Sequence, residues 1–382
     1  MRRIGIIGTG LAGLRVAAEL RGAGFDGRIT AWDSGGGKPY DRPPLTKQLF
    51  GERQVPLARQ GLGDLGDLGV EVIAREVSAI EPDGAGGWLV IESAGAVDVA
   101  GAGEATGAAG TVESGPVQVD VAVVATGSPP RGSVPGARVL YTLADADALA
   151  EAIAPGTRVD IVGGGWIGTE LASTCAERGA RVELWEASQH LLARSLGEAG
   201  TDIWLRWLEA AGVTVHLGRR HPGSAADGTV LVDATGSAPT FPRVAADVTA
   251  RGALATDVQA RVLLGGRSVA GLYAVGDCAD RVSHPCLAGG HWTKALGDGA
   301  LAAASILGTA PPPFLAPAEV FSTQFGREIG LVGVVPSSPP ARESTRDGFV
   351  LRWQDEHGLA ALLAVDSPRE LSRARKALRV AI

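Results

Sequence analysis

The chain has 382 residues, of which 45% are hydrophobic, and its formal net charge is −7. This length is sufficient for two or three domains, and the apolar content supports sizeable cores. An acidic chain of this kind is a poor candidate for general nucleic-acid binding, and it lacks a run of about 18 uninterrupted apolar residues that would span a membrane.

The first element expected is a buried strand over Arg3–Ile7, followed by a glycine-rich turn and a helix over 14–20. In such a unit the first glycine permits the tight turn, the second lets the backbone approach a pyrophosphate, and the third lets the helix pack on the strand. Because the strand follows Met1 so closely, we expect no signal peptide and a cytoplasmic protein. The candidate nucleotide-binding residues of this turn are Gly8, Gly10, Leu11, Ala12 and Gly13.

The strand expected over 28–33 ends in an acidic residue. Asp33 lies where an acceptor for ribose hydroxyls is needed, and Ser34 is the alternative if the register differs by one. A solvent-exposed charge at the end of a strand is the other interpretation of Asp33.

Two further features precede the middle of the chain. Residues 39–47 read Pro-Tyr-Asp-Arg-Pro-Pro-Leu-Thr-Lys, and an apolar run over 119–125 passes into a turn at Thr126 and Gly127. A stretch rich in glycine, alanine and serine over 93–117 lengthens the connection before this run, and we expect a surface hairpin or a flexible loop there.

A second glycine motif repeats the pattern of the first. It reads Gly163-Gly164-Gly165-Trp166-Ile167-Gly168 and lies between a strand expected over 158–162 and a helix over 169–176. The next strand, over 181–186, ends in Glu186, which can accept a hydrogen bond from a ribose 2′-hydroxyl and repels a 2′-phosphate. Two such motifs in context indicate two dinucleotides in one chain, the second being NADH rather than NADPH, although Glu186 could also be a surface charge.

A later strand ends in Gly276-Asp277-Cys278. The three cysteines of the chain, Cys175, Cys278 and Cys286, do not form the C-x-x-C or C-x-x-x-x-C dithiol that passes electrons from a flavin to a disulfide. Cys278 and Cys286 could meet only if the loop between them folds back. The nearby histidines lack a recognisable ligand spacing, so we expect no metal site.

The order of these motifs resembles that of the flavoproteins with two dinucleotide-binding folds. Further segments narrow the resemblance to the bacterial ferredoxin reductases, the group that includes putidaredoxin and rubredoxin reductases. Residues 39–47 are similar to their P-Y-x-R-P-x-L-S-K segment, 291–295 to their E-H-W-x-x-A, and 363–371 to their closing strand and helix. The resemblance covers nearly the whole chain in order.

This resemblance implies an α/β fold with two Rossmann-like dinucleotide-binding domains, one for FAD and one for NAD, and a small α+β C-terminal domain. The FAD-binding domain is expected over 1–140 and 271–310, the NAD-binding domain over 141–270, and the C-terminal interface domain over 311–382. Three consecutive prolines from Pro311 independently end the helix before the last domain.

The family places a lysine beside flavin N5 and an acidic partner after the second glycine motif. These correspond to Lys47 and Glu170, which are therefore the candidate catalytic residues. An ammonium there can stabilise negative charge on the reduced flavin, and a carboxylate can hold the ammonium. The alternative is a pair of surface charges from adjacent domains.

The resemblance also assigns cofactor contacts elsewhere. Asp277 is expected to accept from the ribityl chain, and Trp292 to offer backbone near the isoalloxazine ring. The remaining cofactor candidates are Arg42, Val77, Thr126, Gly127, Arg131 and Gly276 for FAD, and Gly163, Gly165, Ile167, Gly168 and Glu186 for NADH.

The chain departs from the family pattern where the electron acceptor should bind. The acid of E-H-W is Gly290, the W-S-D-Q segment reads Phe-Ser-Thr-Gln over 321–324, and the usual arginine before T-L is Tyr141. Residues 369–379 carry five positive charges and one negative charge. Such a segment can steer an acidic ferredoxin by long-range attraction, or it can be an ordinary solvated helix face.

The function implied is that of an FAD-dependent NADH:ferredoxin-type reductase, whose partner is a ferredoxin or a similar small iron–sulfur protein. Two alternatives stay open. One is a flavin-dependent NADH oxidase or biosynthetic oxidoreductase that acts on a small molecule; the other is an NADH-sensing flavoprotein with an interaction role. Neither nucleic acid nor membrane is an expected partner, and the chain is expected to act as a monomer or a homodimer.

Overall fold

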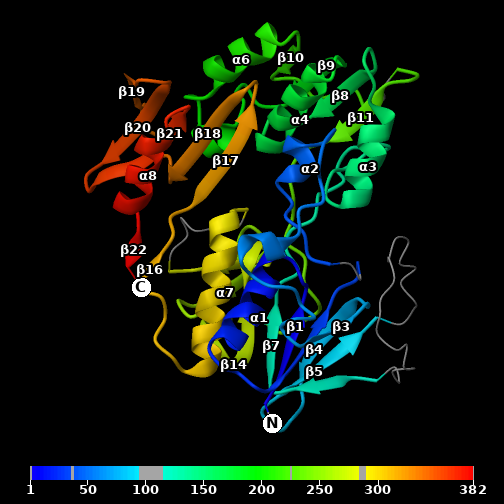
Figure 1. Cartoon of the computed structure of the whole chain (residues 1–382), viewed down its shortest axis with the longest axis vertical. Helices are drawn as coiled ribbons and strands as arrows, with labels where there is room; N and C mark the ends of the chain where they lie inside the picture. Colours follow the sequence, from blue (N-terminus) through cyan, green and yellow to red (C-terminus); the bar gives the residue numbers. More distant parts are fainter. Residues whose placement is uncertain (1, 36–37, 94–114, 224–225, 284–289, 382) are drawn as a thin grey trace.

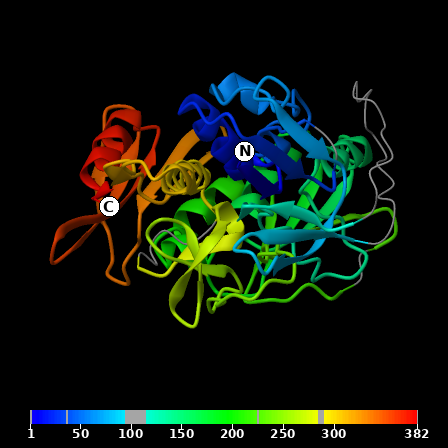
Figure 2. The ribbon, with the colours of Figure 1, turned by 90° about the horizontal axis from the view of Figure 1, so that it is seen from below.

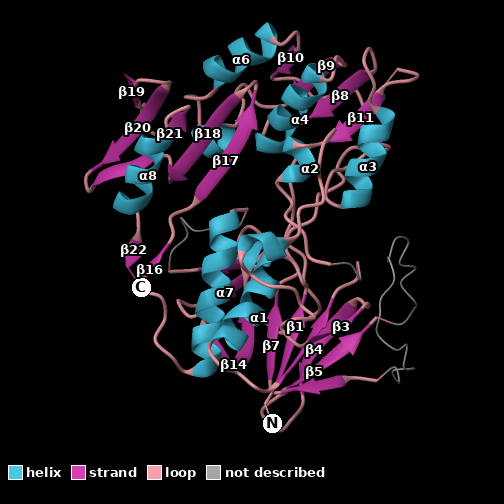
Figure 3. Ribbon diagram, in the orientation of Figure 1, coloured by secondary structure: helices cyan, strands magenta, loops and turns pink. Residues whose placement is uncertain are grey.

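Two mainly parallel sheets and one antiparallel sheet carry most of the strands in the described part of the chain. The structure is a computed structural model that describes residues 2–35, 38–93, 115–223, 226–283 and 290–381 (Figure 1). Figure 3 shows one parallel sheet with helices α1 and α7 at one end of the molecule, and the other two sheets side by side at the opposite end. The α/β fold with two Rossmann-like domains and a small C-terminal domain is confirmed.

The first parallel sheet is built around β1 (Arg3–Ile7) and β7 (Val121–Val124), whose side chains are buried on both faces. Apolar runs of this kind are typical of central parallel strands. The strand order is β15-β12-β13-β14-β7-β1-β2-β3, and the sheet is mixed, because β13 is antiparallel to both β12 and β14. The other strands of this sheet are β2 (Arg28–Trp32), β3 (Val70–Ile73), β12 (Leu254–Thr256), β13 (Arg261–Leu264), β14 (Arg267–Ala274) and β15 (Ala279–Arg281).

Different elements cover the two faces of this sheet. Helices α1 (Leu11–Gly22) and α7 (Trp292–Leu307) pack on the face that carries Ile4 and Ile6. The other face is covered by a three-stranded antiparallel sheet, which consists of β4 (Val77–Pro82), β5 (Trp88–Glu92) and β6 (Val117–Val119). The short helices nearby are α2 (Pro44–Lys47), η1 (Leu57–Gln60) and η2 (Gly276–Cys278).

Strands β5 and β6 are antiparallel neighbours that flank the glycine-rich stretch. The hairpin or loop expected over 93–117 lies largely outside the described residues, which stop at 93 and resume at 115.

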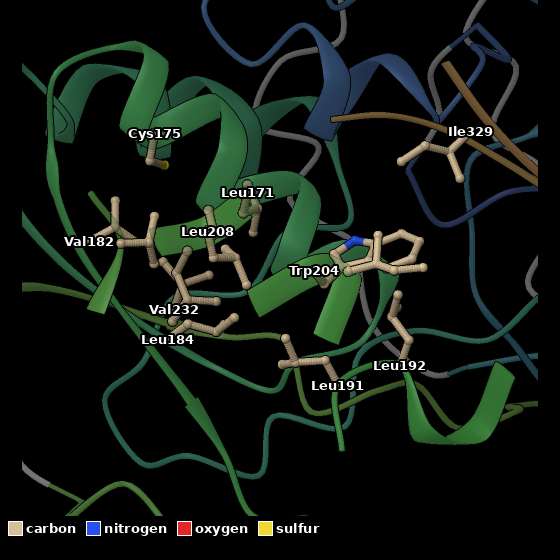
Figure 4. Packing of buried hydrophobic residues seen from close by; sticks show 14 of the residues in the cluster. Leu171, Cys175, Val182, Leu184, Leu191, Leu192, Trp204, Leu208, Val232 and Ile329 are labelled. Atoms are coloured by element: carbon tan, nitrogen blue, oxygen red, sulfur yellow. The ribbon is translucent and has the colours of Figure 1, made fainter. Parts of the chain in front are cut away.

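The second parallel sheet has the order β10-β9-β8-β11. Its strands are β8 (Arg158–Val162), β9 (Arg181–Glu186), β10 (Thr214–Leu217) and β11 (Val230–Asp233). Helices α4 (Trp166–Glu177) and α6 (Thr201–Ala210) cover one face, and Figure 4 shows Leu171 and Leu208 packed towards the apolar side chains of this sheet. Helix α3 (Leu143–Ala152) begins at a capping box formed by Thr142 and Asp145, and α5 (Ala193–Leu196) follows β9.

The C-terminal domain is a five-stranded antiparallel sheet with the order β17-β18-β21-β20-β19. Its strands are β17 (Glu319–Gln324), β18 (Arg327–Gly333), β19 (Ala341–Ser344), β20 (Phe349–Asp355) and β21 (Gly358–Val365). Helix α8 (Pro368–Ala377) packs on one face through Ala374. The other face joins the core of the second parallel sheet, and Figure 4 shows Ile329 beside Trp204.

The first and last segments of this domain pair with each other, since β16 (Phe314–Leu315) is antiparallel to β22 (Val380–Ala381). In the view of Figure 2 the C-terminal domain, in orange and red, lies next to the gold helix α7. The C-terminal domain therefore contacts both of the other units.

The sheets divide the chain differently from the ranges that the sequence suggested. Strands β12, β13 and the first part of β14 pair into the first sheet, although residues up to 270 were assigned to the NAD-binding domain. The second parallel sheet ends with β11 at Asp233. We therefore propose that the NAD-binding domain ends between 233 and 254. The sequence could not indicate this boundary, because short apolar strands carry no mark of the sheet that they join.

Among the described residues, no helix combines the length and apolar content needed to cross a membrane. The same residues include no group of three or more histidine, cysteine, aspartate or glutamate side chains arranged to hold a metal ion.

Candidate active site

The first glycine motif forms a tight turn between β1 and α1. Gly8 has a φ of +100°, and an added Cβ there would lie 2.5 Å from the carbonyl oxygen of Ala125. A Cβ on Gly13 would lie 2.1 Å from the oxygen of Gly8, so only glycine allows the helix to start so close to the strand. A Cβ on Gly10 would meet nothing within 4 Å, which leaves open space at the N-terminus of α1. The turn thus has the close backbone packing and the open helix N-terminus that a pyrophosphate needs.

A cleft of about 500 Å³ opens beside this turn. Asp33 lies in it, and its carboxylate accepts from the backbone N–H of Gly35 at 2.8 Å and from the hydroxyl of Thr9. Arg42 also lines the cleft, where its guanidinium stacks 3.9 Å from the ring centroid of Tyr141. The other expected residues in the lining are Gly8, Ser34, Val77 and Thr126.

Arg131 is placed differently from this group. Its side chain is exposed, its Nε donates to the carbonyl of Ser237 at 3.1 Å, and the residue is absent from the cleft lining. Gly127 likewise lies beside the cleft rather than in its lining, with a φ of +79° that permits the turn after β7.

The second glycine motif has the same construction. A Cβ on Gly163 or Gly168 would lie 2.4 Å or less from a backbone oxygen, whereas a Cβ on Gly165 would meet nothing within 4 Å. Glu186 accepts from the backbone N–H of Gly164 and from that of Ser188, both at 2.7 Å. This carboxylate is therefore held at the motif by two backbone donors. Ile167, in the first turn of α4, is 48% exposed.

A buried ionic cluster lies under the Gly-Asp turn. Lys294 donates to the carbonyl of Gly276 at 2.8 Å and pairs with Asp298, which also accepts from the N–H of Gly276 at 3.1 Å. Arg281 pairs with the other oxygen of Asp298 at 2.6 Å. The turn is thus fixed from below, and the carboxylate of Asp277 accepts from the N–H of Gly290 at 2.8 Å.

Lys47 and Glu170 form an ion pair between helix α2 and helix α4, the helix that follows the second glycine motif. The Lys47 Nζ lies 3.1 Å from Glu170 Oε1, and the two side chains are 17% and 6% exposed. Lys47 ends the short helix α2, which packs on α4, where Glu170 lies in the second turn. The same carboxylate accepts from Thr46 and Ser322, each at 2.5 Å. The two candidate catalytic residues therefore meet in a shielded position.

An aromatic edge lies beside this ion pair. The Lys47 Nζ is 5.0 Å from the ring centroid of Phe321, which is 38% exposed, and this ring meets Trp292 edge-on at 6.4 Å. The Trp292 Nε1 donates to Asp41 at 3.1 Å. Burial raises the pKa of Asp41, while the hydrogen bond from Trp292 and the charge of Lys47 act in the opposite direction.

Three residues of this site, Thr46, Ser322 and Asp41, were not predicted from the sequence. Thr46 and Asp41 lie inside the segment 39–47, and Ser322 occupies the serine of the family's W-S-D-Q pattern. Position within these segments was the signal that could have found them. What they contact becomes visible only when α2, α4 and β17 are brought together.

The two cysteines of the described chain are separate, buried thiols. Cys175 belongs to the core of the second parallel sheet and Cys278 to the core between the first sheet and β4–β6. Burial raises the pKa of Cys175 to about 12 and also raises that of Cys278. Neither thiol is placed to exchange electrons with the other. Cys286 lies outside the described residues.

We expect these two thiols to be inert in the native protein. At pH 8 both remain protonated, and a protonated, buried thiol is a poor nucleophile. A Cys286→Ser variant should therefore show no rapid reaction with Ellman's reagent when it is native. Once unfolded, it should release two equivalents of the reagent's coloured thiolate, one for each remaining cysteine. Rapid release of an equivalent from the native variant would contradict the structure at one of these positions.

Comparison with known proteins agrees with this arrangement. A family model described as pyridine nucleotide-disulphide oxidoreductase matches residues 2–299. The chain is 30% identical to the ferredoxin reductase component of the chlorobenzene dioxygenase of Cupriavidus sp. (strain PS12), over 98% of this chain and 91% of that protein. It is 35% identical to the ferredoxin–NAD(+) reductase component of the biphenyl dioxygenase system of Paraburkholderia xenovorans (strain LB400), but this similarity covers 56% of this chain and only 48% of that protein.

A solved structure shares the fold as a whole. Putidaredoxin reductase, in its covalent complex with putidaredoxin, superposes with a TM-score of 0.78 at 22% identity, over 98% of this chain and 92% of that chain. The chain therefore belongs to the pyridine nucleotide-disulphide oxidoreductase family, within its group of ferredoxin reductases.

Proposed function

We propose that the protein is an FAD-dependent NADH:ferredoxin reductase. The observation that carries this proposal is the Lys47–Glu170 pair, which joins α2 to α4 just after the second glycine motif and lies beside an exposed aromatic edge. The similarity to ferredoxin reductase components over most of the chain supports the choice of acceptor.

The residues present fit both cofactors of the family. Open space at Gly10 and Gly165 allows a pyrophosphate to reach the N–H groups of α1 and α4. We propose that Asp33 and Glu186, whose carboxylates lie beside these turns, accept from the ribose hydroxyls. Bound at these residues, FAD would supply the conversion between the two-electron donor NADH and a one-electron acceptor.

We propose that Lys47 supplies fixed positive charge at the reacting end of the FAD site. Glu170 keeps the ammonium in place, because a carboxylate with three donors around it has little freedom to move. The limited exposure of both side chains strengthens their electrostatic effect, since less water screens the charge. The ring of Phe321 lies next to the ammonium and meets Trp292 edge-on.

The basic helix α8 lies close to this aromatic edge. The Arg375 Nε donates to Glu319 at 2.8 Å, and the carbonyl of Glu319 contacts the ring of His291 at 3.2 Å, one residue before Trp292. Because Glu319 and Phe321 share β17, the helix lies beside the strand that carries the exposed ring. We propose that an acidic ferredoxin docks over α8 and this edge.

Ion pairs reduce the charge that α8 presents. Arg373 pairs with Glu370 at 2.6 Å, and Arg375 pairs with Glu319, which is 7% exposed. Reversing Arg375 would set two carboxylates against each other and disturb β17, so this residue is a poor choice for a docking test. Arg369 and Lys376 are exposed and are better positions.

Reversal of these two charges should weaken the ferredoxin-dependent reaction. We expect Arg369→Glu/Lys376→Glu to lower kcat/KM for an acidic [2Fe–2S] ferredoxin about tenfold at low salt and to flatten its salt dependence. Reduction of ferricyanide should not change, because a small acceptor does not need the docking surface.

The matched control is Arg342→Glu/Arg346→Glu, which changes the net charge equally at the far edge of the same domain. An equal loss in this control would mean that net charge alone is responsible. If the unmodified enzyme reduced no acidic ferredoxin but reduced oxygen or an organic acceptor rapidly, the small-molecule oxidoreductase would be the better assignment. A long-lived complex of reduced enzyme and nucleotide that passes its electrons to neither kind of acceptor would favour the sensing protein.

We also propose a cytoplasmic location. The buried cysteines of the described chain are present as thiols rather than as a disulfide, as is usual in a reducing compartment.

A further inference from the structure

A line of buried hydrogen bonds leads from an indole of the NAD-binding domain to the carboxylate of Glu170. The Trp204 Nε1 donates to Gln324 Oε1 at 2.9 Å, and Gln324 Nε2 donates to Ser322 Oγ at 2.8 Å. The Ser322 hydroxyl in turn donates to Glu170 Oε1 at 2.5 Å. All four side chains belong to residues that are 4% exposed or less.

The direction of every bond in this line is determined by its two ends. An indole N–H can only donate, so the Gln324 amide must present its oxygen to Trp204. The amide then presents its NH₂ group to Ser322, whose oxygen accepts. The single hydroxyl proton of Ser322 is left to donate to Glu170, which as a carboxylate can only accept. The line therefore has one consistent arrangement of protons.

Three parts of the chain contribute to the line. Trp204 and Glu170 come from α6 and α4, whereas Ser322 and Gln324 project from the inward face of β17. Thr323, between them on the strand, is exposed. Thr46 holds the second oxygen of Glu170 from α2. The orientation of the carboxylate is thus set jointly by the C-terminal sheet and by the segment that carries Lys47.

We propose that Ser322 and Gln324 are positioning residues for the Lys47–Glu170 pair. This inference rests on the proposed function of that pair. Without the hydroxyl of Ser322, Oε1 keeps only the ammonium as a partner, and the carboxylate can turn about the bond to Thr46. The ammonium would then follow it and leave the position at which its charge is needed. The C-terminal domain would accordingly act on the reduction step as well as contribute to the partner surface.

The indole N–H of Trp204 provides a test of the line that does not depend on activity. The chain has eight tryptophans, and Trp204→Phe identifies the resonance of interest in the spectrum of the ¹⁵N-labelled FAD-loaded protein. We expect this resonance to shift in Ser322→Ala and in Glu170→Gln, because polarisation passes along a hydrogen-bonded line. Thr323→Ala, one residue away on the outer face, should leave it in place.

The kinetic test is stopped-flow reduction of the flavin at saturating NADH. Ser322→Ala should be about tenfold slower, Ser322→Thr should recover most of the rate because it keeps the hydroxyl, and Thr323→Ala should equal the unmodified enzyme. The effect of Ser322→Ala should largely disappear in a Lys47→Ala background, since both changes act on the same group.

Two outcomes would overturn the inference while the proposed function stands. One is an unchanged Trp204 resonance in Ser322→Ala, which would mean that the line does not form. The other is a shifted resonance with a reduction rate equal to that of Thr323→Ala, which would make the line purely structural. If Lys47→Ala itself did not slow reduction, the role of the pair would be wrong, and the positioning role of Ser322 would fall with it.

Discussion

Replacement of Lys47 by alanine is expected to slow reduction of the bound flavin by NADH about 100-fold, the usual effect of removing one preorganised charge or donor from a shielded site. Its ammonium is held 3.1 Å from Glu170 and is mostly shielded from water. Binding of FAD should change little, because Lys47 is absent from the lining of the cleft beside the first glycine motif. Stopped-flow absorbance of the flavin and a titration of the FAD-free protein with FAD separate the two effects.

A double-mutant cycle with Glu170→Gln tests whether the two residues act as a unit. Glutamine keeps the size of the side chain and an oxygen that can accept from Thr46 or Ser322, but it loses the charge that holds the ammonium. The two changes should therefore be strongly non-additive. Additive effects would show that the residues contribute separately.

Lys38→Ala is the matched control, since it removes the same charge from an exposed lysine nine residues earlier in the chain. An equal loss of rate in this variant would mean that the slower reduction in Lys47→Ala comes from the change in net charge and not from the position of Lys47. Lys47→Arg is informative in another way, because it keeps the charge and changes the geometry of its donors. Partial recovery in Lys47→Arg would indicate that the charge matters more than its exact placement.

The two nucleotide-binding turns were predictable because their chemistry is local. Each needs glycine at positions where an added Cβ would strike a backbone oxygen, as at Gly8 and Gly163. These constraints act within a few residues of each other, so they leave a pattern in the sequence. The strands on either side are also local features, and β8 and β9 have the bounds that the sequence predicted.

The surroundings of the ion pair could not be predicted in the same way. Thr46, Glu170 and Ser322 come from segments more than 120 residues apart, and nothing in any one of them states where its hydroxyl or carboxylate will find a partner. The internal partners of Arg131 and Arg375 were equally hidden in the sequence. The sequence suggested a cofactor contact for Arg131 and a partner contact for Arg375, and it did not show the bonds that these side chains make within the chain, to Ser237 and Glu319 respectively.

The sequence resemblance supplied the pairing of Lys47 with Glu170, and the structure supplies what holds it. The resemblance transferred residue roles along the chain without any account of the side chains between the motifs. Hydrogen bonds from two other segments explain why a buried carboxylate is tolerated at this position, because a buried charge needs donors as well as a counter-ion.

The preference for NADH is the second large effect that we expect. The carboxylate of Glu186 is fixed at the second glycine motif by two backbone N–H groups, so it cannot turn away from an incoming 2′-phosphate. Repulsion between like charges, together with loss of the hydrogen bond to the ribose hydroxyl, should favour NADH over NADPH by at least about tenfold in kcat/KM, which corresponds to ~1.4 kcal/mol.

Glu186→Gln should remove most of this preference. Glutamine has the same length and still accepts from one of the two N–H groups, but it carries no charge. Two exposed arginines follow β10, and the N–H of Arg219 donates to the Glu186 carbonyl at 3.0 Å, so positive charge is already close to the phosphate position. We therefore expect kcat/KM for NADPH to rise about tenfold relative to that for NADH, and Arg219→Ala added to Glu186→Gln to reverse part of the gain.

The control for this prediction is Glu183→Gln, on the same strand. Its carboxylate contacts His216 at 2.9 Å, so its removal changes the net charge equally without altering the glycine motif. The NADH to NADPH ratio should stay as in the unmodified enzyme. A ratio near one in the unmodified enzyme, or an equal change in Glu183→Gln and Glu186→Gln, would show that the side chain of Glu186 does not face the ribose. The carboxylate would then serve only to close the loop through Gly164 and Ser188, and coenzyme choice would have to come from other groups around the second motif.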